Sequence, residues 1–488
     1  MQLNSDNINK IIKNNPDIKV YTKPESTSKI IHFGVGGFHR AHQVIYTGEA
    51  MEKSNDHSWG LTGVGILETD KMMADCLKEQ DYNYTLMLKP NTGENFASIV
   101  GTIGDYIYAY DDYVSLITKA LNPNLAIVSM TVTEGGYNID PNTGKFDWSD
   151  ELINYDLKNQ NSPKTIFGYL ALIIKYRKNN NLNGVTLLSC DNVQHNGKVL
   201  EYTFLEFLSK LDSNLAVWTK ENCSFPNSMV DRITPKTANI DQQMLLDQFG
   251  IQDKWPVVCE PFTQWVIEDN FVAGRPKWEL AGTQFVDDVS PYEKMKLRLL
   301  NSSHQALAYL GYLHGYRYVH ESAQDETIKK FLLRYMKNEV EATLDPVPGI
   351  NLDEYQHSII ERFANPNIAD TLQRICEFTS DRIPVFNLPA INEQINQGKD
   401  LKLSALIIAS WRVYLDGLDE SGQKIDIVDN KKQMLLDFIT KNSNPIEFIK
   451  IKDIFHNLSN DATFVKLYNQ AYTNIKKYGA IKAISLFL

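Results

Sequence analysis

Short runs of β-branched residues alternate with longer helical patterns between about residue 29 and residue 260 of this chain. The clearest of these runs are KIIHF at 29–33, WGLTGVGI at 59–66, LAIVSM at 125–130 and GVTLLS at 184–189. Strands that are separated by helices form βαβ units, whose strands pair in parallel. The alternation therefore predicts an α/β domain that is built on a mainly parallel sheet.

Two further runs, YTLML at 84–88 and ASIVGTI at 97–103, follow one another with no helical pattern between them. Antiparallel strands can be joined by short connections, whereas parallel strands need a longer crossover. We therefore expect this pair to form an antiparallel addition to the same sheet.

Beyond about residue 290 the apolar residues recur with the 3.6-residue period of amphipathic helices. The segment Ser290-Pro291-Tyr292-Glu293 offers a capping serine, a proline at the first helical position and a glutamate three residues after the cap. The long periodic segments lie at 291–313, 326–341, 403–416 and 430–441. We expect a mostly α-helical domain at 287–488, following a first domain at 1–286.

The composition excludes several classes of partner. Sixty acidic against 49 basic residues leave a net charge of −11, which disfavours nucleic acid and anionic membranes. The five cysteines are scattered and never form a CxxC pair, which is untypical of a disulfide scaffold. No run of 18 apolar residues occurs. We expect a cytoplasmic protein with no membrane-spanning helix, acting as a monomer or weak oligomer.

The first chemical motif directly follows the run KIIHF. A strand that leads through glycines into a helix lets the main chain approach a pyrophosphate, whose charge the helix N-terminus stabilises. His39 stands where the third glycine of GxGxxG would fall, so a tight turn without a ligand is the alternative. The predicted Rossmann-like cofactor residues here are Gly34, Val35, Gly36, Gly37, Phe38 and Arg40.

An acidic residue after the second strand of such a fold binds the adenosine ribose. Glu68 and Asp70 both lie there. Asp70 is better placed to cap the helix that begins near Lys71, so we assign the ribose to Glu68. A carboxylate at this point repels the 2′-phosphate of NADP, and the predicted cofactor is therefore NAD.

The second motif lies in the capped helix and contains Glu293, Lys296, Asn301 and His304. At about 100° per residue, His304 lies roughly 80° from Lys296, and Asn301 roughly 140°. The four side chains therefore share one side of the helix, although a lysine on a helix is more often a solvated charge. Oxidation of a secondary alcohol needs a base and donors for the developing alkoxide, which a desolvated lysine, amides and an imidazole can supply.

Other polar residues follow predicted strands. Asn192 follows the run at 184–189, Thr133 and Glu134 follow the run at 125–130, and Asp231 follows another short strand, as part of a salt-bridged turn or a pocket wall. Ligands of open α/β sheets bind beyond the carboxyl ends of strands, although Asn192 could equally form an Asx turn. His39 and His42 have the spacing of metal ligands, but no third ligand accompanies them, and we predict no metal.

The chain resembles the polyol-specific long-chain dehydrogenases, the family of mannitol 2-dehydrogenase and fructuronate reductase. The likeness runs nearly end to end, and the family shares the missing third glycine and a K-x4-N-x2-H signature. The motifs that carry it are HFGVGGFHRAHQ at 32–43, TVTEGGY at 131–137, LSCDNVQHNG at 188–197, MVDRITP at 229–235 and KLRLLNSSH at 296–304.

The resemblance implies a metal-independent, NAD-dependent enzyme whose helical domain closes over its nucleotide domain. Lys296 would be the general base, Asn192 and Asn301 the oxyanion clamp, and His304 would position the substrate hydroxyl. Glu134 and Glu293 would line a proton path. Thr133 would contact the cofactor, and Arg374, Asp231 and, more weakly, Arg382 would contact the substrate.

The substrate is the less determined part of this assignment. The string QHNG at 194–197 is more similar to mannitol 2-dehydrogenases than to fructuronate reductases. Arg374 could bind a hydroxyl or a carboxylate. We expect mannitol and fructose ahead of mannonate and fructuronate or tagaturonate. A dinucleotide-binding sensor that has lost catalysis is a further alternative.

Overall fold

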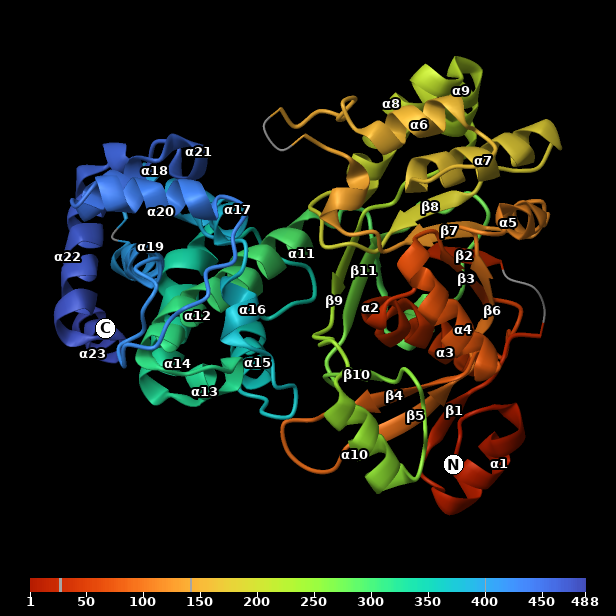
Figure 1. Cartoon of the computed structure of the whole chain (residues 1–488), viewed down its shortest axis with the longest axis horizontal. Coiled ribbons are helices and arrows are strands. Elements are labelled where there is room, and N and C mark those ends of the chain that lie inside the picture. The colour runs from red at the N-terminus through yellow and green to blue at the C-terminus, as the bar shows by residue number, and fades with distance from the viewer. Residues whose placement is uncertain (26–28, 141–142, 400) are drawn as a thin grey trace. The chain divides into compact units, whose positions relative to one another are not determined.

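A computed structural model describes residues 1–25, 29–140, 143–399 and 401–488 of the chain. These residues form two compact units, Met1–Ser290 and Pro291–Leu488. The sequence analysis places the boundary four residues earlier. Figure 1 shows sheets with covering helices in the first unit and helices throughout the second.

The first unit is built on a five-stranded sheet with the order β6-β3-β2-β7-β8, in which every neighbouring pair is parallel. Its strands are β2 (Ile30–Phe33), β3 (Leu61–Gly65), β6 (Ile103–Tyr108), β7 (Ile127–Met130) and β8 (Thr186–Ser189). The chain leaves β2 for β3 on one side and later returns to β7 on the other side. The carboxyl ends of β2 and β7 therefore flank the switch point where α/β sheets bind ligands.

Helices cover both faces of this sheet. Successive side chains of a strand point to opposite faces, so the residues of one strand contribute to two different core clusters. Ile31 and Phe33 belong to one core cluster, whereas Ile30 belongs to the other. The first cluster includes residues of α5 (Tyr113–Ala120), α7 (Ile166–Asn179), α8 (Asn196–Leu211) and α9 (Ser213–Asn222). The second includes residues of α2 (Gly37–Ala41), α3 (Gln43–Ser54) and α4 (Lys71–Glu79). This arrangement confirms the predicted Rossmann-like class.

Two smaller sheets complete the unit, and one of them corrects a prediction. The run at 97–103 divides between β5 (Phe96–Val100) and β6, which belong to different sheets. β5 pairs antiparallel with β4 (Tyr84–Leu88), as expected, but in a separate sheet with the order β1-β5-β4-β10. The remaining strands are β1 (Lys19–Tyr21), β10 (Val257–Cys259), β9 (Ser228–Asp231), β11 (Gln264–Glu268) and β12 (Gln284–Val286), and the remaining α-helices are α1 (Ser5–Asn14), α6 (Glu151–Lys158) and α10 (Asn239–Phe249).

The second unit is helical, as the 3.6-residue periodicity predicts. Its centre is α12 (Ser302–His314), which is buried along nearly its whole length and contacts α14, α16, α19 and α23. The surrounding α-helices are α13 (Val319–Gln324), α14 (Glu326–Tyr335), α15 (Leu352–Phe363), α16 (Leu372–Cys376), α17 (Thr379–Phe386), α18 (Leu388–Asn396), α19 (Lys402–Tyr414), α20 (Lys432–Lys441), α21 (Lys452–Phe455), α22 (Ala462–Tyr478) and α23 (Ala480–Phe487).

The helix predicted at the domain junction begins at Ser290, where the sequence places its cap. It is not a uniform α-helix, because α11 (Ser290–Met295) passes into a π-helix at Lys296–Asn301 before α12 continues it. A second π-helix, Met336–Val340, follows α14. Such segments bond residues five apart and are frequent at functional sites.

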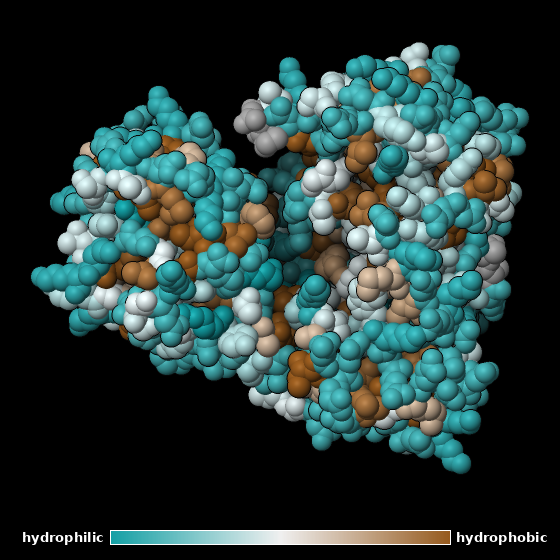
Figure 2. All heavy atoms as spheres, in the orientation of Figure 1, coloured by the Kyte–Doolittle hydropathy of each residue, from teal (hydrophilic) through white to brown (hydrophobic). Residues whose placement is uncertain are grey.

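The face of the molecule that Figure 2 draws is mainly hydrophilic. On the face drawn in Figure 2, hydrophobic side chains form small groups among hydrophilic ones. Within the described parts of the chain, no helix has both the length and the apolar character that a membrane crossing requires.

Candidate active site

The glycine-rich segment after β2 has one glycine that the fold requires and two that leave the main chain open. Gly34 has a φ of +86°, and a Cβ there would lie 2.1 Å from the carbonyl oxygen of Thr131. By contrast, a Cβ on Gly36 would meet no atom closer than 3.9 Å, and one on Gly37 none closer than 3.6 Å. The main chain at the start of α2 can therefore be approached closely by a pyrophosphate.

The side chains of this segment are occupied within the protein. Val35 is buried, and the ring of Phe38 stacks on His42 at 4.9 Å. Arg40 is 1% exposed, and its guanidinium donates to the carbonyl of Trp255 at 2.6 Å. A cofactor contact by Arg40 would thus have to come from its main chain, which the sequence did not indicate.

His39 occupies the position of the missing third glycine. Its ring stacks on that of His32 in β2, with centroids 3.3 Å apart. His32 in turn lies within hydrogen-bonding distance of the hydroxyls of Ser129 and Thr131, at 2.8 and 3.1 Å. In a GxGxxG sequence the third glycine lets the helix pack closely on the strand. Here the flat ring of His39 occupies the space between α2 and the sheet.

The two acidic residues after β3 have different surroundings. The carboxylate of Asp70 accepts the main-chain N–H groups of Ile66 and Leu67, both at 2.9 Å. It therefore fixes the loop, instead of capping α4 as the sequence analysis expects. Glu68, in the 3₁₀ turn Glu68–Asp70, is exposed, and its main-chain carbonyl accepts the hydroxyl of Tyr108 at 3.2 Å. This leaves Glu68 as the carboxylate that is available to a ribose.

The predicted residues beyond β7, β8 and β9 are also described. Thr133 adopts a φ of +62° and a ψ of 172°, and Glu134 is exposed at the start of the 3₁₀ turn Glu134–Tyr137. Asn192 is exposed in the loop after β8, and Asp231 is buried at the end of β9. Because β7 and β8 are parallel neighbours, the first three residues follow adjacent strand ends at one edge of the sheet.

The π-helix in the second unit changes the geometry that the sequence suggests. A π-turn accommodates one extra residue, so every later residue lags by about 100° relative to a regular α-helix. The separation of Lys296 and Asn301 falls from roughly 140° to roughly 40°, and that of Lys296 and His304 from roughly 80° to roughly 20°. The three polar residues thus form a row along one face, which we call the polar row.

The polar row carries buried groups with unused hydrogen-bonding capacity. Lys296 is 7% exposed and His304 is 8% exposed. Considering the described residues only, the Oδ1 of Asn301 and the Nε2 of His304 are buried without a hydrogen-bond partner. Buried polar atoms are rarely left unsatisfied in folded proteins, so such a pair points to a polar ligand. Glu293, one turn before Lys296, is also buried.

His304 is held in place and kept neutral. Its ring stacks on Phe363 at the end of α15, with centroids 3.9 Å apart. Burial lowers its pKa well below the usual range, and the charges of Arg374, Arg362 and Arg382 lower the pKa further. A neutral imidazole has one N–H donor and one acceptor nitrogen, which suits contact with a hydroxyl.

The two predicted substrate arginines lie next to each other but are differently engaged. Arg374 donates through Nε to Asp370 at 2.7 Å, and its Nη2 contacts the other oxygen of the same carboxylate. Arg382 donates to the carbonyls of Arg374 and Ile375, both at 3.0 Å. Asp370 stands four residues before Arg374, so the i, i+4 spacing could have revealed this pair. Nothing in the sequence pattern marks Phe363.

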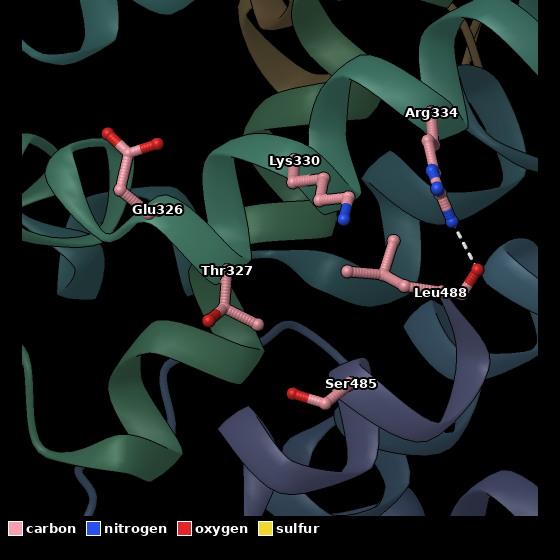
Figure 3. Close-up of a pocket in the computed structure, with 6 residues that line it drawn as sticks. All are labelled: Glu326, Thr327, Lys330, Arg334, Ser485 and Leu488. Carbon is pink, nitrogen blue, oxygen red and sulfur yellow. Dashed lines mark hydrogen bonds between the residues drawn. The ribbon is translucent and has the colours of Figure 1, made fainter.

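Neither a metal cluster nor the surface pocket of the second unit adds to this set. Among the residues that the structure describes, no three His, Cys, Asp or Glu side chains are grouped to hold a metal ion. The pocket in Figure 3 is lined by α14 and the end of the chain, where Arg334 contacts the carbonyl of Leu488. Its lining residues are Glu326, Thr327, Lys330, Arg334, Ser485 and Leu488, none of which was predicted as a site residue.

Comparison with known proteins covers both units. Residues 28–280 match the family model described as mannitol dehydrogenase Rossmann domain, and residues 288–476 match the mannitol dehydrogenase C-terminal domain. The mannitol 2-dehydrogenase of Aspergillus clavatus is 39% identical, with 100% of this chain and 99% of the relative aligned. That of Emericella nidulans is 40% identical over the same shares of both chains.

Two solved structures share the whole fold. Pseudomonas fluorescens mannitol 2-dehydrogenase, in a ternary complex with NAD and D-mannitol, is 39% identical with a TM-score of 0.89, covering 100% of this chain and 99% of that one. A substrate-free D-sorbitol dehydrogenase is 32% identical with a TM-score of 0.90, covering 99% and 100%.

Proposed function

Because the chain belongs to the mannitol dehydrogenase family, we propose that it interconverts D-mannitol and D-fructose with NAD as the cofactor. The observation that carries this proposal is the polar row, with its buried lysine and two buried polar atoms that have no hydrogen-bond partner among the described residues. A polyol carries several hydroxyl groups, which can donate to the Oδ1 of Asn301 and form a hydrogen bond with the Nε2 of His304. The open main chain at Gly36 and Gly37 and the exposed Glu68 fit a dinucleotide.

The proposed chemistry assigns one role to each side chain. Lys296 accepts the proton of the substrate hydroxyl, and NAD, when bound, supplies the acceptor for the hydride that leaves the same carbon. The amides of Asn192 and Asn301 donate to the oxygen while its charge develops, and His304 holds the hydroxyl beside the reacting carbon. Glu134 and Glu293 pass the proton between Lys296 and water. Thr133 and the segment from Gly34 to Arg40 contact the cofactor.

The pairing of Arg374 favours a neutral polyol over a sugar acid. Arginine recognises a carboxylate with two parallel hydrogen bonds. Asp370 already occupies the Nε and Nη2 edge of Arg374, and its carboxylate offsets the charge of this arginine. The remaining N–H groups of Arg374 and Arg382 can donate to hydroxyls, which need no charge compensation. Asp231 is a further acceptor for a substrate hydroxyl.

We further propose that the enzyme needs no metal, since Lys296 provides the base. We also propose that it acts in the cytoplasm, which is consistent with five free and buried cysteines in the described chain. A monomer or weak oligomer suffices for this chemistry, because one chain supplies every proposed residue. Light scattering of the purified enzyme checks the last point.

The decisive experiment compares substrates with the purified protein. NADH oxidation is followed with fructose, fructuronate and tagaturonate, and NAD reduction with D-mannitol and D-sorbitol. We expect turnover of fructose and mannitol. Activity on the uronates alone would replace this proposal by the sugar-acid alternative. NADH binding without turnover of any of these compounds would support a sensor instead. Activity should persist after treatment with a chelator.

A further inference from the structure

The loop after β7 contains a residue in a conformation that its side chain disfavours. Thr133 has a φ of +62° and a ψ of 172°. This region of backbone space is used almost only by glycine, and threonine is β-branched, which makes the conformation more costly. Such a conformation persists only where neighbouring groups enforce it.

A buried carboxylate from the next strand end supplies that enforcement. Asp191, two residues past the end of β8 and 8% exposed, accepts the N–H of Val132 through Oδ2 and the N–H of Thr133 through Oδ1, both at 3.0 Å. The hydroxyl of Tyr137 donates to the same Oδ2 at 2.7 Å. All three groups donate, which suits an ionised carboxylate. Asp191 thus bonds both ends of the segment 132–137.

Asp191 is itself firmly anchored. The Nδ2 of Asn196 donates to its main-chain carbonyl at 3.0 Å and to the carbonyl of Ser228 in β9 at 2.8 Å. The hydroxyl of Ser189 lies 2.5 Å from that of Tyr137 and accepts the N–H of Asp191 at 3.3 Å. These bonds fix the Asp191 segment relative to β8 and β9, and the Asp191 carboxylate in turn fixes the loop after β7.

We propose that Asp191 is a positioning residue of the reaction: it holds Thr133 in its strained conformation and so places Thr133 and Glu134 for catalysis. This inference rests on the proposed function, in which Thr133 contacts the cofactor and Glu134 lies on the proton path. The neighbouring contact of Thr131 with Gly34 extends the same ordered loop to the glycine-rich segment, because the Thr131 hydroxyl donates to the Gly34 carbonyl at 2.6 Å.

A double-mutant cycle tests this role. Asp191→Asn replaces one acceptor oxygen by an NH2 group that faces a main-chain donor. In the otherwise wild-type enzyme we expect it to lower kcat for mannitol oxidation by roughly 10- to 100-fold, the loss that a small misplacement of catalytic groups produces. In the background of Thr133→Gly, where the conformation is no longer costly, the same change should lower kcat by no more than about threefold.

Asp156 provides a matched control. It is 1% exposed and accepts the N–H groups of Lys164 and Thr165, both at 2.8 Å, together with the hydroxyl of Thr165. Asp156→Asn should lower the melting temperature, as Asp191→Asn should, but it should leave kcat unchanged in both backgrounds. Equal losses of kcat from the two substitutions would mean a merely structural role.

Hydrogen exchange supplies a measurement that does not depend on turnover. The amides of 132–134 should exchange faster in Asp191→Asn than in the wild type, and at the wild-type rate in Asp156→Asn. If the wild type turned over no polyol, the proposed function would fail while this measurement still tested the loop. Unchanged exchange, or a loss of kcat that is as large with Thr133→Gly as without it, would overturn the role of Asp191.

Discussion

Gly34 and Thr131 approach each other so closely that a single methyl group cannot be placed between them. A Cβ at position 34 would lie 2.1 Å from the carbonyl oxygen of Thr131, and the φ of +86° already disfavours a side chain there. The contact fixes the loop after β2 against the loop after β7. The two loops therefore depend on each other for their shape.

We predict that Gly34→Ala unfolds at a lower temperature and fails to bind NADH. The left-handed conformation alone costs roughly 1–2 kcal/mol for a side chain, and the clash adds to that cost. Gly36→Ala is the matched control, since its Cβ would meet no atom closer than 3.9 Å. It should keep the melting temperature but weaken NADH binding, measured by fluorescence titration. Undiminished binding by Gly36→Ala would place the pyrophosphate elsewhere.

Replacement of Glu68 should change the choice of cofactor. Removing a charge that would repel the 2′-phosphate is worth roughly 1–4 kcal/mol at close range. We therefore expect Glu68→Ser to raise the ratio of kcat/KM for NADP to that for NAD by about tenfold or more. Asp70→Asn should leave this ratio unchanged and lower the melting temperature, because Asp70 holds the N–H groups of Ile66 and Leu67. The reverse pattern would assign the ribose to Asp70.

Lys296→Met should abolish base catalysis while the protein stays folded. General-base catalysis contributes roughly 10²- to 10⁴-fold, and we expect kcat for mannitol oxidation to fall within that range. The wild-type rate should rise with pH as the lysine loses its proton, and this dependence should disappear in the variant. Lys294→Met is the control, since Lys294 lies two residues before Lys296 and pairs with Asp345 at 3.0 Å. A Lys296→Met enzyme with normal kcat would leave the mechanism without a base.

His32 should make the protein less stable in acid. Burial lowers the pKa of His32 to about 3, whereas an unfolded histidine titrates near 6.5. Between these values the unfolded chain holds the extra proton, so the free energy of unfolding falls as pH falls. From pH 6.5 to 4.5 the loss from this group is roughly 2 kcal/mol.

The corresponding measurement is denaturant unfolding at several pH values. His32→Asn should show a shallower fall of stability below pH 6.5 than the wild type. His57, which is only partly buried, serves as the control, and His57→Asn should retain the wild-type slope. An unchanged slope in His32→Asn would mean that the ring is protonated in the folded protein.

The parallel sheet could be predicted because four of its strands, β2, β3, β7 and β8, lie in β-branched runs with helices between them. The division of the run at 97–103 between two sheets could not be predicted, since Ile99, Val100 and Ile103 are apolar residues that suit a strand of either sheet. The two residues between β5 and β6, Gly101 and Thr102, carry the chain from one sheet to another. Glycine inside a strand pattern was the available signal.

In the candidate site, too, some features could be predicted from the sequence and others could not. The residue types of the polar row were evident from the sequence, but its alignment depends on a hydrogen-bond pattern that the spacing of apolar residues does not report. The role of Asp191 could not be predicted from the sequence either. Its neighbour Asn192 was predicted because it follows the end of a strand, whereas the buried carboxylate of Asp191 acts on a loop that is 58 positions away in the sequence.

Because of the π-helix at Lys296–Asn301, the alignment of the polar row depends on how many residues this segment contains, and not on which residues they are. Side-chain exchanges at Leu297 or Leu299 would leave the surplus residue in place, and the amide and the imidazole would still follow the amine. Removing one amino acid between them would restore a regular α-helix and could rotate all of α12 about its axis. During divergence of such chains, insertions and deletions in this helix are therefore more consequential than substitutions.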